Sequence, residues 1–237
     1  MNRTDLTADQ AARLARVTGL AYLGIAAFAI FANFIVLGGF TAAGDPDAVF
    51  AAIREGEQMF RFGLGAFLVM LVLDAVVAFG LYLLLRPAGP ALALFAFITH
   101  LIYTSMHGAG MIELARIPPL LGSLPGDEAP GAAAAVMAYL RAHSASFMIS
   151  LTFFGVHLVA AGLLVMRAAW WPSAFGVLLI AAGVGYVVDT FAYLLLADPK
   201  PVRAFTETFV IIVALIAELG FALWMLVMGV RRTAWPA

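Results

Sequence analysis

Seven ionisable side chains suited to acid–base chemistry lie within long apolar stretches of the sequence. They are Asp74, His100, His107, Glu113, His157, Asp189 and Glu218, and His143 lies near the edge of another such stretch. A charged side chain at the centre of a bilayer costs roughly 3 kcal/mol by insertion scales, so such groups face the bundle interior, a partner or water. We therefore expect these side chains inside the protein, where carboxyl and imidazole groups can bind a ligand or transfer a proton.

The positions of these groups along their segments predict which of them meet. At about 1.5 Å per residue, Asp74 and Glu218 lie near mid-depth, where two carboxyl groups can share a proton or meet a histidine. His157 lies at an inner level, and Asp189 lies further out. The candidate residues for a ligand-binding cluster are Asp74, His157, Asp189, Glu218, His107 and His143.

Helical spacing also predicts the surroundings of single residues. Asp189 shares a helix face with Tyr186 and Tyr193, whose hydroxyl groups can donate hydrogen bonds to its carboxylate. Asp189 should therefore point into the bundle, stabilised by hydroxyl or histidine partners or by being protonated. His107 precedes small residues in "HGAG", which is typical of a close helix crossing. A purely structural role, as a hydrogen-bond clamp between spans, is the alternative for each buried acid.

The spacing of the histidines does not indicate a metal or cofactor site. His143 and His157 are separated by roughly 21 Å along one helix, so they cannot bind one metal ion together. His100 and His157 lie at one depth, as two axial haem ligands would, but the sequence has no haem-attachment motif. It also has no cysteine, no Walker loop and no HExxH motif. We predict neither a metal nor a cofactor, and we assign no catalytic residue.

The composition indicates that membrane-spanning helices position these groups. Of the 237 residues, 64% are hydrophobic and 11% are charged, whereas soluble domains are about half apolar and about a quarter charged. Six segments reach the roughly 20 apolar residues that a span needs. They lie near residues 17–39, 60–85, 91–115, 145–166, 172–197 and 206–229. We predict an all-α, polytopic integral membrane bundle of six transmembrane helices, in one domain over residues 1–237.

Short local signals predict where several elements begin. Thr7 and Gln10 form a capping-box pattern, so a helix should begin near residue 8. Asp45 and Pro46 suit an N-cap and a first helical residue, and they predict a short interfacial helix over residues 46–55. Residues 118–131, rich in Pro and Gly, should form a loop. The alanine-rich segment that follows should extend the fourth span beyond the membrane.

The charges predict an orientation and argue against one class of partner. With both termini in the cytoplasm, the 13 lysine and arginine residues divide seven inside to six outside. The two shortest loops then carry arginine without an acid on the cytoplasmic side, which favours this orientation. The net charge of −1 provides no basic field for nucleic acid. The expected partners are the lipid bilayer and a small-molecule or lipid ligand, and the sequence defines no oligomeric state.

Three stretches carry a resemblance to a known family: "FRFGLGAFLVMLVLDAVVAFGLYLLLRP", the segment from "HSASF" through "FFGVH" to "GYVVDTFA", and "IAELGFALWMLVMGV". The chain resembles, from about residue 13 to residue 230, a bacterial membrane family known as domain of unknown function 4386. The matching positions are Arg61, Asp74, His143, His157, Asp189 and Glu218. The resemblance implies a six-helix protein of the bacterial inner membrane and implies no reaction.

Four functional hypotheses follow from these observations. In the first, the buried polar cluster lines a cavity that binds a small or lipid-like ligand. In the second, the protein is an intramembrane enzyme, in which a neutral carboxylic acid protonates a lipid or isoprenoid substrate. The third is a proton-coupled carrier, and the fourth is a structural partner subunit whose polar groups hold helices together.

Overall fold

The computed structural model describes residues 6–42, 44–123 and 131–236, and within these ranges it contains helices and no strand. Six helical stretches are long and apolar enough to cross a membrane. They are Ala8–Thr41, Glu57–Ala88, Pro90–Ser123, Ala132–Arg167, Ser173–Leu195 and Lys200–Met228. Each predicted span overlaps a different one of these stretches, so the all-α class and the six spans are confirmed.

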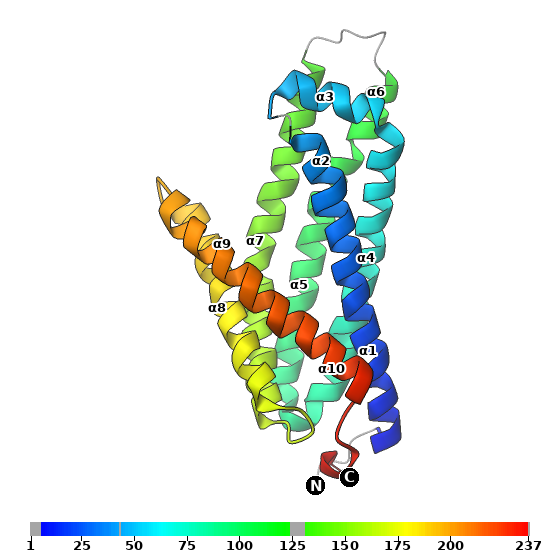
Figure 1. Cartoon of the computed structure of the whole chain (residues 1–237), viewed down its shortest axis with the longest axis vertical. Helices are drawn as coiled ribbons and strands as arrows, with labels where there is room; N and C mark the ends of the chain where they lie inside the picture. Colours follow the sequence, from blue (N-terminus) through cyan, green and yellow to red (C-terminus); the bar gives the residue numbers. More distant parts are fainter. Residues whose placement is uncertain (1–5, 43, 124–130, 237) are drawn as a thin grey trace. The chain divides into compact units, whose positions relative to one another are not determined.

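Several of these stretches are built from more than one helical element (Figure 1). In chain order the elements are α1 (Ala8–Ala29), η1 (Ile30–Leu37), α2 (Gly38–Thr41), α3 (Pro46–Glu55), α4 (Glu57–Leu85), η2 (Arg86–Ala88), α5 (Pro90–Ala115), α6 (Ile117–Ser123), α7 (Ala132–Arg167), α8 (Ser173–Leu195), α9 (Lys200–Ala214), η3 (Leu215–Leu219), α10 (Gly220–Met228) and η4 (Arg232–Ala234). Elements η1 and η3 are π-helical and interrupt otherwise continuous α-helices, a feature that is often found at functional sites.

The local signals in the sequence have the predicted effects. The backbone N–H of Thr7 donates to Gln10 Oε1 at 2.8 Å, and the backbone N–H of Gln10 donates to Thr7 Oγ1 at 3.3 Å. This is a reciprocal capping box, and α1 begins at the next residue. Helix α3 covers the predicted residues 46–55, and the Asp45 side chain caps it by accepting from the backbone N–H of Ala48 at 3.0 Å.

The predicted loop over residues 118–131 is wrong for its first part. Residues Ile117–Ser123 form helix α6, because Pro118 and Pro119 lie in the first turn, where a missing N–H costs no hydrogen bond. Residues 124–130 of the predicted loop lie outside the described residues. The predicted helix ahead of residue 145 is confirmed, since α7 begins at Ala132, and its extension beyond the membrane remains a prediction.

Contacts between residues divide the chain into two compact units. Unit 1 consists of Met1–Gly24, Leu73–Thr104 and Ile149–Ala237, and unit 2 consists of Ile25–Val72 and Ser105–Met148. The expectation that the chain forms one domain remains a prediction. Each unit is described separately below.

Close helix packing in unit 1 depends on glycine. Gly155 and Gly162 of α7 face Gly183 and Gly176 of α8, with a seven-residue spacing on both helices. A Cβ atom on Gly155 would lie 2.6 Å from the carbonyl oxygen of Gly183, and one on Gly162 would lie 2.6 Å from that of Gly176. Small residues of this kind allow two backbones to approach closely. This contact fixes α7, the helix that carries His157, against α8.

The segment after α10 is anchored within unit 1. Trp171 Nε1 donates to the carbonyl oxygen of Gly229 at 2.9 Å, and Trp235 Nε1 donates to that of Leu6 at 3.0 Å. Helix α10 also packs closely on α1, because a Cβ atom on Gly19 would lie 2.5 Å from the carbonyl oxygen of Ala222. These contacts hold the first and last helices of the chain together (Figure 1).

Unit 2 has its own hydrophobic core. Its buried members are Ala32, Val49, Ile53, Phe60, Ala66, Phe67, Met70, Met111, Leu114, Ile117, Leu121, Val136 and Leu140. Val49 and Ile53 are the buried residues of α3, so the short helix packs on this core through the face that carries them. The Asp45 cap and Gly56 set the two ends of α3.

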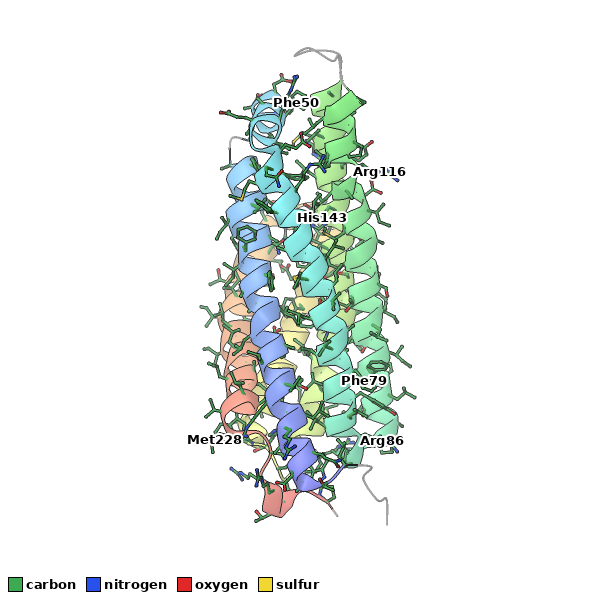
Figure 2. All side chains as sticks on the ribbon, turned by 90° about the vertical axis from the view of Figure 1, so that its right-hand side faces the viewer. Phe50, Phe79, Arg86, Arg116, His143 and Met228 are labelled. Atoms are coloured by element: carbon green, nitrogen blue, oxygen red, sulfur yellow. The ribbon has the colours of Figure 1, made fainter. Side chains whose placement is uncertain are left out.

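Large apolar side chains also cover the outside of the helices. Figure 2 shows side chains projecting from every long helix, with Phe79 among them. Phe79 is 53% exposed and Phe34 is 72% exposed. Such exposure is unfavourable in water but not among lipid tails, which are as apolar as leucine.

Candidate functional site

Asp74 and His100 meet in the interior of unit 1. Asp74 lies on α4 and His100 on α5, and they are 2% and 1% exposed. His100 Nε2 lies 3.4 Å from Asp74 Oδ1. The other carboxyl oxygen, Asp74 Oδ2, is buried and has no hydrogen-bond partner among the described residues. Buried polar atoms are nearly always paired, so this oxygen requires an explanation.

His157 continues the contact on the next helix. His100 Nδ1 lies 3.2 Å from His157 Nε2, and His157 Nδ1 lies 2.9 Å from the backbone carbonyl oxygen of Ala96 on α5. We call Asp74, His100, His157 and the Ala96 carbonyl the acid–histidine chain. It links α4, α5 and α7 through consecutive hydrogen-bond contacts. The predicted meeting of a mid-depth carboxyl group with a histidine is therefore observed.

Glu218 is held by two tyrosines. Tyr22 of α1 donates to Glu218 Oε2 at 2.8 Å, and Tyr186 of α8 donates to Glu218 Oε1 at 3.3 Å. Glu218 lies in the π-helical element η3. Because a π-turn contains one residue more than an α-turn, it changes the direction in which the following side chains point. The two oxygens of the Glu218 carboxyl group accept hydrogen bonds from two different helices, α1 and α8.

Aromatic rings connect these two groups of residues. The centroid of the Phe154 ring lies 5.7 Å from that of His100, 4.8 Å from that of Tyr103 and 5.5 Å from that of Tyr186. Asp74 and Glu218 are also close enough to interact electrostatically. The interior of unit 1 therefore combines two carboxyl groups, two imidazoles and a set of aromatic rings.

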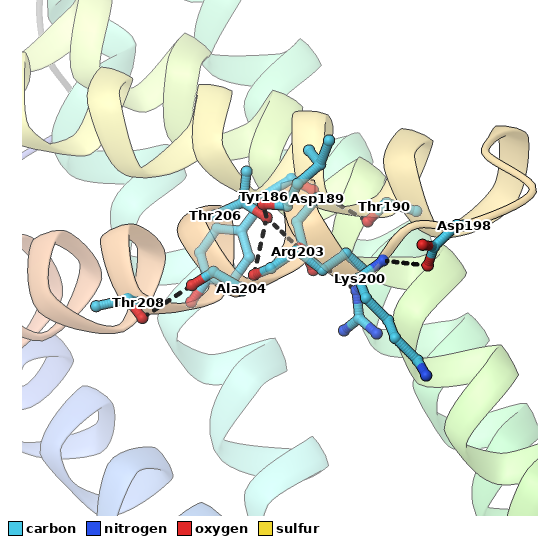
Figure 3. A network of polar contacts seen from close by, with 10 residues as sticks. Tyr186, Asp189, Thr190, Asp198, Lys200, Arg203, Ala204, Thr206 and Thr208 are labelled. Atoms are coloured by element: carbon cyan, nitrogen blue, oxygen red, sulfur yellow. Dashed lines mark hydrogen bonds and ion pairs between the residues drawn. The ribbon is translucent and has the colours of Figure 1, made fainter.

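Asp189 lies apart from this set, in a separate network between α8 and α9. Thr206 Oγ1 donates to Asp189 Oδ1 at 2.5 Å, and Arg203 Nε lies 3.5 Å from the same oxygen. Figure 3 shows Thr206 and Arg203 of α9 facing Asp189 of α8. The predicted donation from Tyr186 and Tyr193 to Asp189 is wrong, because Tyr186 donates to Glu218 and Tyr193 lies beneath the Arg203 guanidinium at 5.4 Å.

His107 and His143 lie in unit 2, buried among aromatic rings. The centroid of the Phe67 ring lies 5.7 Å from that of His107 and 5.5 Å from that of His143, and both pairs are edge-to-face. His143 belongs to α7 and is labelled in Figure 2. The close crossing predicted at "HGAG" is observed, since a Cβ atom on Gly110 would lie 2.9 Å from Ser146 Cβ. The six candidate residues therefore lie in three places: the interior of unit 1, the α8–α9 contact and unit 2.

The two-histidine haem alternative does not fit this geometry. The rings of His100 and His157 have centroids 4.3 Å apart and are in direct contact, whereas axial ligands lie on opposite faces of a macrocycle. Among the described residues no group of three or more histidine and carboxylate side chains is arranged to hold a metal ion.

Several residues of these contacts escaped prediction from the sequence. His100 joins Asp74 to His157, although the sequence analysis expected it in the interior without including it in the candidate cluster. Tyr22 also escaped because a tyrosine in the first span has no pattern that identifies a partner 196 residues later. The missed partners of Asp189 are Arg203 and Thr206. The spacing of Arg203 and Thr206, three residues apart on one face of an amphipathic helix, was the available signal.

Comparisons with known proteins show a family relationship and assign no activity. The sequence profile of the family "Domain of unknown function (DUF4386)" matches residues 17–229. An "Uncharacterized protein" of Archaeoglobus fulgidus is 25% identical over 166 residues, which cover 70% of this chain and 82% of the relative. No solved structure matches the chain. Since the family profile covers most of its length, the chain belongs to the DUF4386 family of domains of unknown function.

Proposed function

We propose that this multi-pass membrane protein binds a small or lipid-like ligand at the acid–histidine chain of unit 1. The observation that carries the proposal is Asp74 Oδ2, a buried carboxyl oxygen without a hydrogen-bond partner among the described residues. A carboxyl group inside a bundle is costly, and an unmet acceptor adds about 1–3 kcal/mol. A ligand that donates a hydrogen bond to this oxygen would remove that cost.

The surroundings support a ligand with apolar parts. The rings of Phe154 and Tyr103 lie near His100, with centroids 4.8 Å apart and planes tilted by 39°, and they provide apolar surfaces beside this histidine. On α5, α7 and α8 of unit 1, a groove of about 280 Å³ is lined only by apolar residues. Such a groove suits an acyl or isoprenoid chain. Ligand sites commonly combine an apolar lining with a few fixed polar groups.

The test compares molecules that remain bound after purification. Wild-type protein, Asp74→Asn and Asp47→Asn would be transferred to nanodiscs of one phospholipid, and native mass spectrometry would detect any additional bound mass. Asp47 is an exposed acid on α3 and serves as the matched control. We expect wild type and Asp47→Asn to retain a common additional molecule that Asp74→Asn loses. Equal retention by all three proteins would refute the proposal.

Acid catalysis on a lipid or isoprenoid is a second candidate. It is favoured by the contact between Asp74 and His100, since a carboxyl group in apolar surroundings with a histidine partner can donate a proton and recover it. A mixture of membrane lipids incubated with wild type and with Asp74→Asn would be analysed for isomerised or hydrated products. A product formed by wild type alone supports the enzyme, and no product with retained binding supports the ligand-binding role.

A further inference from the structure

The hydrogen-bond direction along the acid–histidine chain can be assigned from its fixed end. The carbonyl oxygen of Ala96 can only accept, so His157 Nδ1, 2.9 Å away, carries a proton. His157 is 2% exposed, and such burial favours the neutral imidazole, which has one N–H, so its Nε2 atom is an acceptor. The atom facing it at 3.2 Å, His100 Nδ1, must therefore be the donor.

The same reasoning assigns a proton to the contact between His100 and Asp74. With its proton on Nδ1, a neutral His100 has a bare lone pair on Nε2, which faces Asp74 Oδ1 at 3.4 Å. Two lone pairs facing each other repel, so a proton must lie between these atoms. It belongs either to a neutral Asp74 carboxyl group or to a His100 imidazolium beside an Asp74 carboxylate. Both arrangements contain the same number of protons and have no net charge.

From this geometry we infer that Asp74, His100 and His157 together bind one proton beyond those of two neutral imidazoles, and that this proton is held between Asp74 and His100. The inference concerns a proton as the ligand and is independent of the proposed small or lipid-like molecule. Release of the proton would leave Asp74 negative beside two neutral histidines and would break the contact with His100 Nε2. The protonation state and the arrangement of α4 and α5 at this site are thereby linked.

The neighbouring groups favour retention of this proton. Glu218, whose carboxyl oxygens accept hydrogen bonds from Tyr22 and Tyr186, interacts electrostatically with Asp74. Tyr22 of α1 and Tyr103 of α5 also interact electrostatically with Asp74. Loss of the proton would leave a negative Asp74 in an apolar interior that also holds the Glu218 carboxyl group, which is unfavourable.

The test measures where protons reside. Infrared spectra of the protein in nanodiscs would be compared for wild type, Asp74→Asn and Asp47→Asn, and 15N-histidine NMR would report the protonation of each ring. At neutral pH we expect either a carboxylic-acid carbonyl band lost only in Asp74→Asn, or a doubly protonated His100 that becomes neutral in Asp74→Asn. In both cases His157 should carry its proton on Nδ1. An ionised Asp74 with two neutral histidines would overturn the inference.

Two substitutions at His157 test the direction of the chain. His157→Gln keeps a donor for Ala96 and an acceptor for His100, so the proton should stay. His157→Phe removes the acceptor, which allows His100 to move its proton to Nε2 and donate to an Asp74 carboxylate. We therefore expect His157→Phe, in folded protein, to lose the extra proton at neutral pH and His157→Gln to keep it. Identical protonation of Asp74 and His100 in both variants would contradict the assigned direction.

Discussion

His100 Nδ1 lies 3.2 Å from His157 Nε2, although 57 residues separate them in the chain. His157 Nδ1 also lies 2.9 Å from the carbonyl oxygen of Ala96. Because a carbonyl oxygen can only accept, this hydrogen bond between α7 and α5 has His157 as its donor. A histidine pair of this kind can hold or transfer a proton, whereas a pair of packed apolar residues cannot. It is the feature that most clearly separates this interior from ordinary helix packing.

The Gly155–Gly183 contact should be essential for the packing of α7 on α8. Gly155→Ala places a methyl group within 2.6 Å of a backbone oxygen that cannot move away alone. We expect a loss of about 1–3 kcal/mol, which is typical of overpacking, measured as a lower thermal unfolding midpoint in detergent. Gly65→Ala is the control, because a Cβ atom there meets nothing within 4 Å. Equal midpoints for the two variants would argue against the close contact.

The threonine hydroxyl on Asp189 should matter more than a similar hydroxyl nearby. Thr206 donates to Asp189 at 2.5 Å, whereas Thr208, as far as the described residues go, donates to the Ala204 carbonyl of its own helix. Thr206→Val should therefore destabilise the α8–α9 contact by about 1.5–3 kcal/mol, the range for a hydrogen bond to a charged group. Thr208→Val should be close to neutral. Proteolysis rates of the α8–α9 connection in detergent would measure the difference, and similar rates would count against the network.

Glu218 should depend on both of its tyrosine donors. Tyr22→Phe and Tyr186→Phe each remove one hydroxyl group, and the double variant leaves both carboxylate oxygens without these donors. We expect the double variant to lose more stability than the sum of the single variants, since a half-satisfied carboxylate still has one partner. Thermal unfolding would show this, with the half-buried Tyr82→Phe as the control. Strict additivity would indicate that the two hydrogen bonds act independently.

The cap on α3 should control the local stability of that helix. Asp45 accepts from the backbone N–H of Ala48 at 3.0 Å, so Asp45→Ala removes a side-chain cap while Asp45→Asn preserves an acceptor. Hydrogen exchange of the first α3 amides should become about five-fold faster in Asp45→Ala. Asp45→Asn should exchange nearly as slowly as wild type. A similar acceleration in both variants would indicate that the carboxylate charge, rather than the hydrogen bond, stabilises the helix.

The sequence by itself determined the class of the protein, its six spans and several helix ends. These follow from local physics: an apolar stretch of sufficient length has to form hydrogen bonds within itself in lipid, and Thr7 or Asp45 caps a helix through residues three positions away. The predicted loop over residues 118–123 was wrong because proline in a first turn is compatible with a short helix.

Only the tertiary structure decided which buried polar groups meet. Helical periodicity gives the face of each residue but not the neighbour that the face contacts, and a π-helical turn at Glu218 changes that face without a signal in the pattern. Asp189 therefore meets Arg203 and Thr206, while Tyr186 donates to Glu218. The physical reason is that burial of a polar group depends on depth and composition, which are local, whereas its partner depends on how helices distant in the chain pack together.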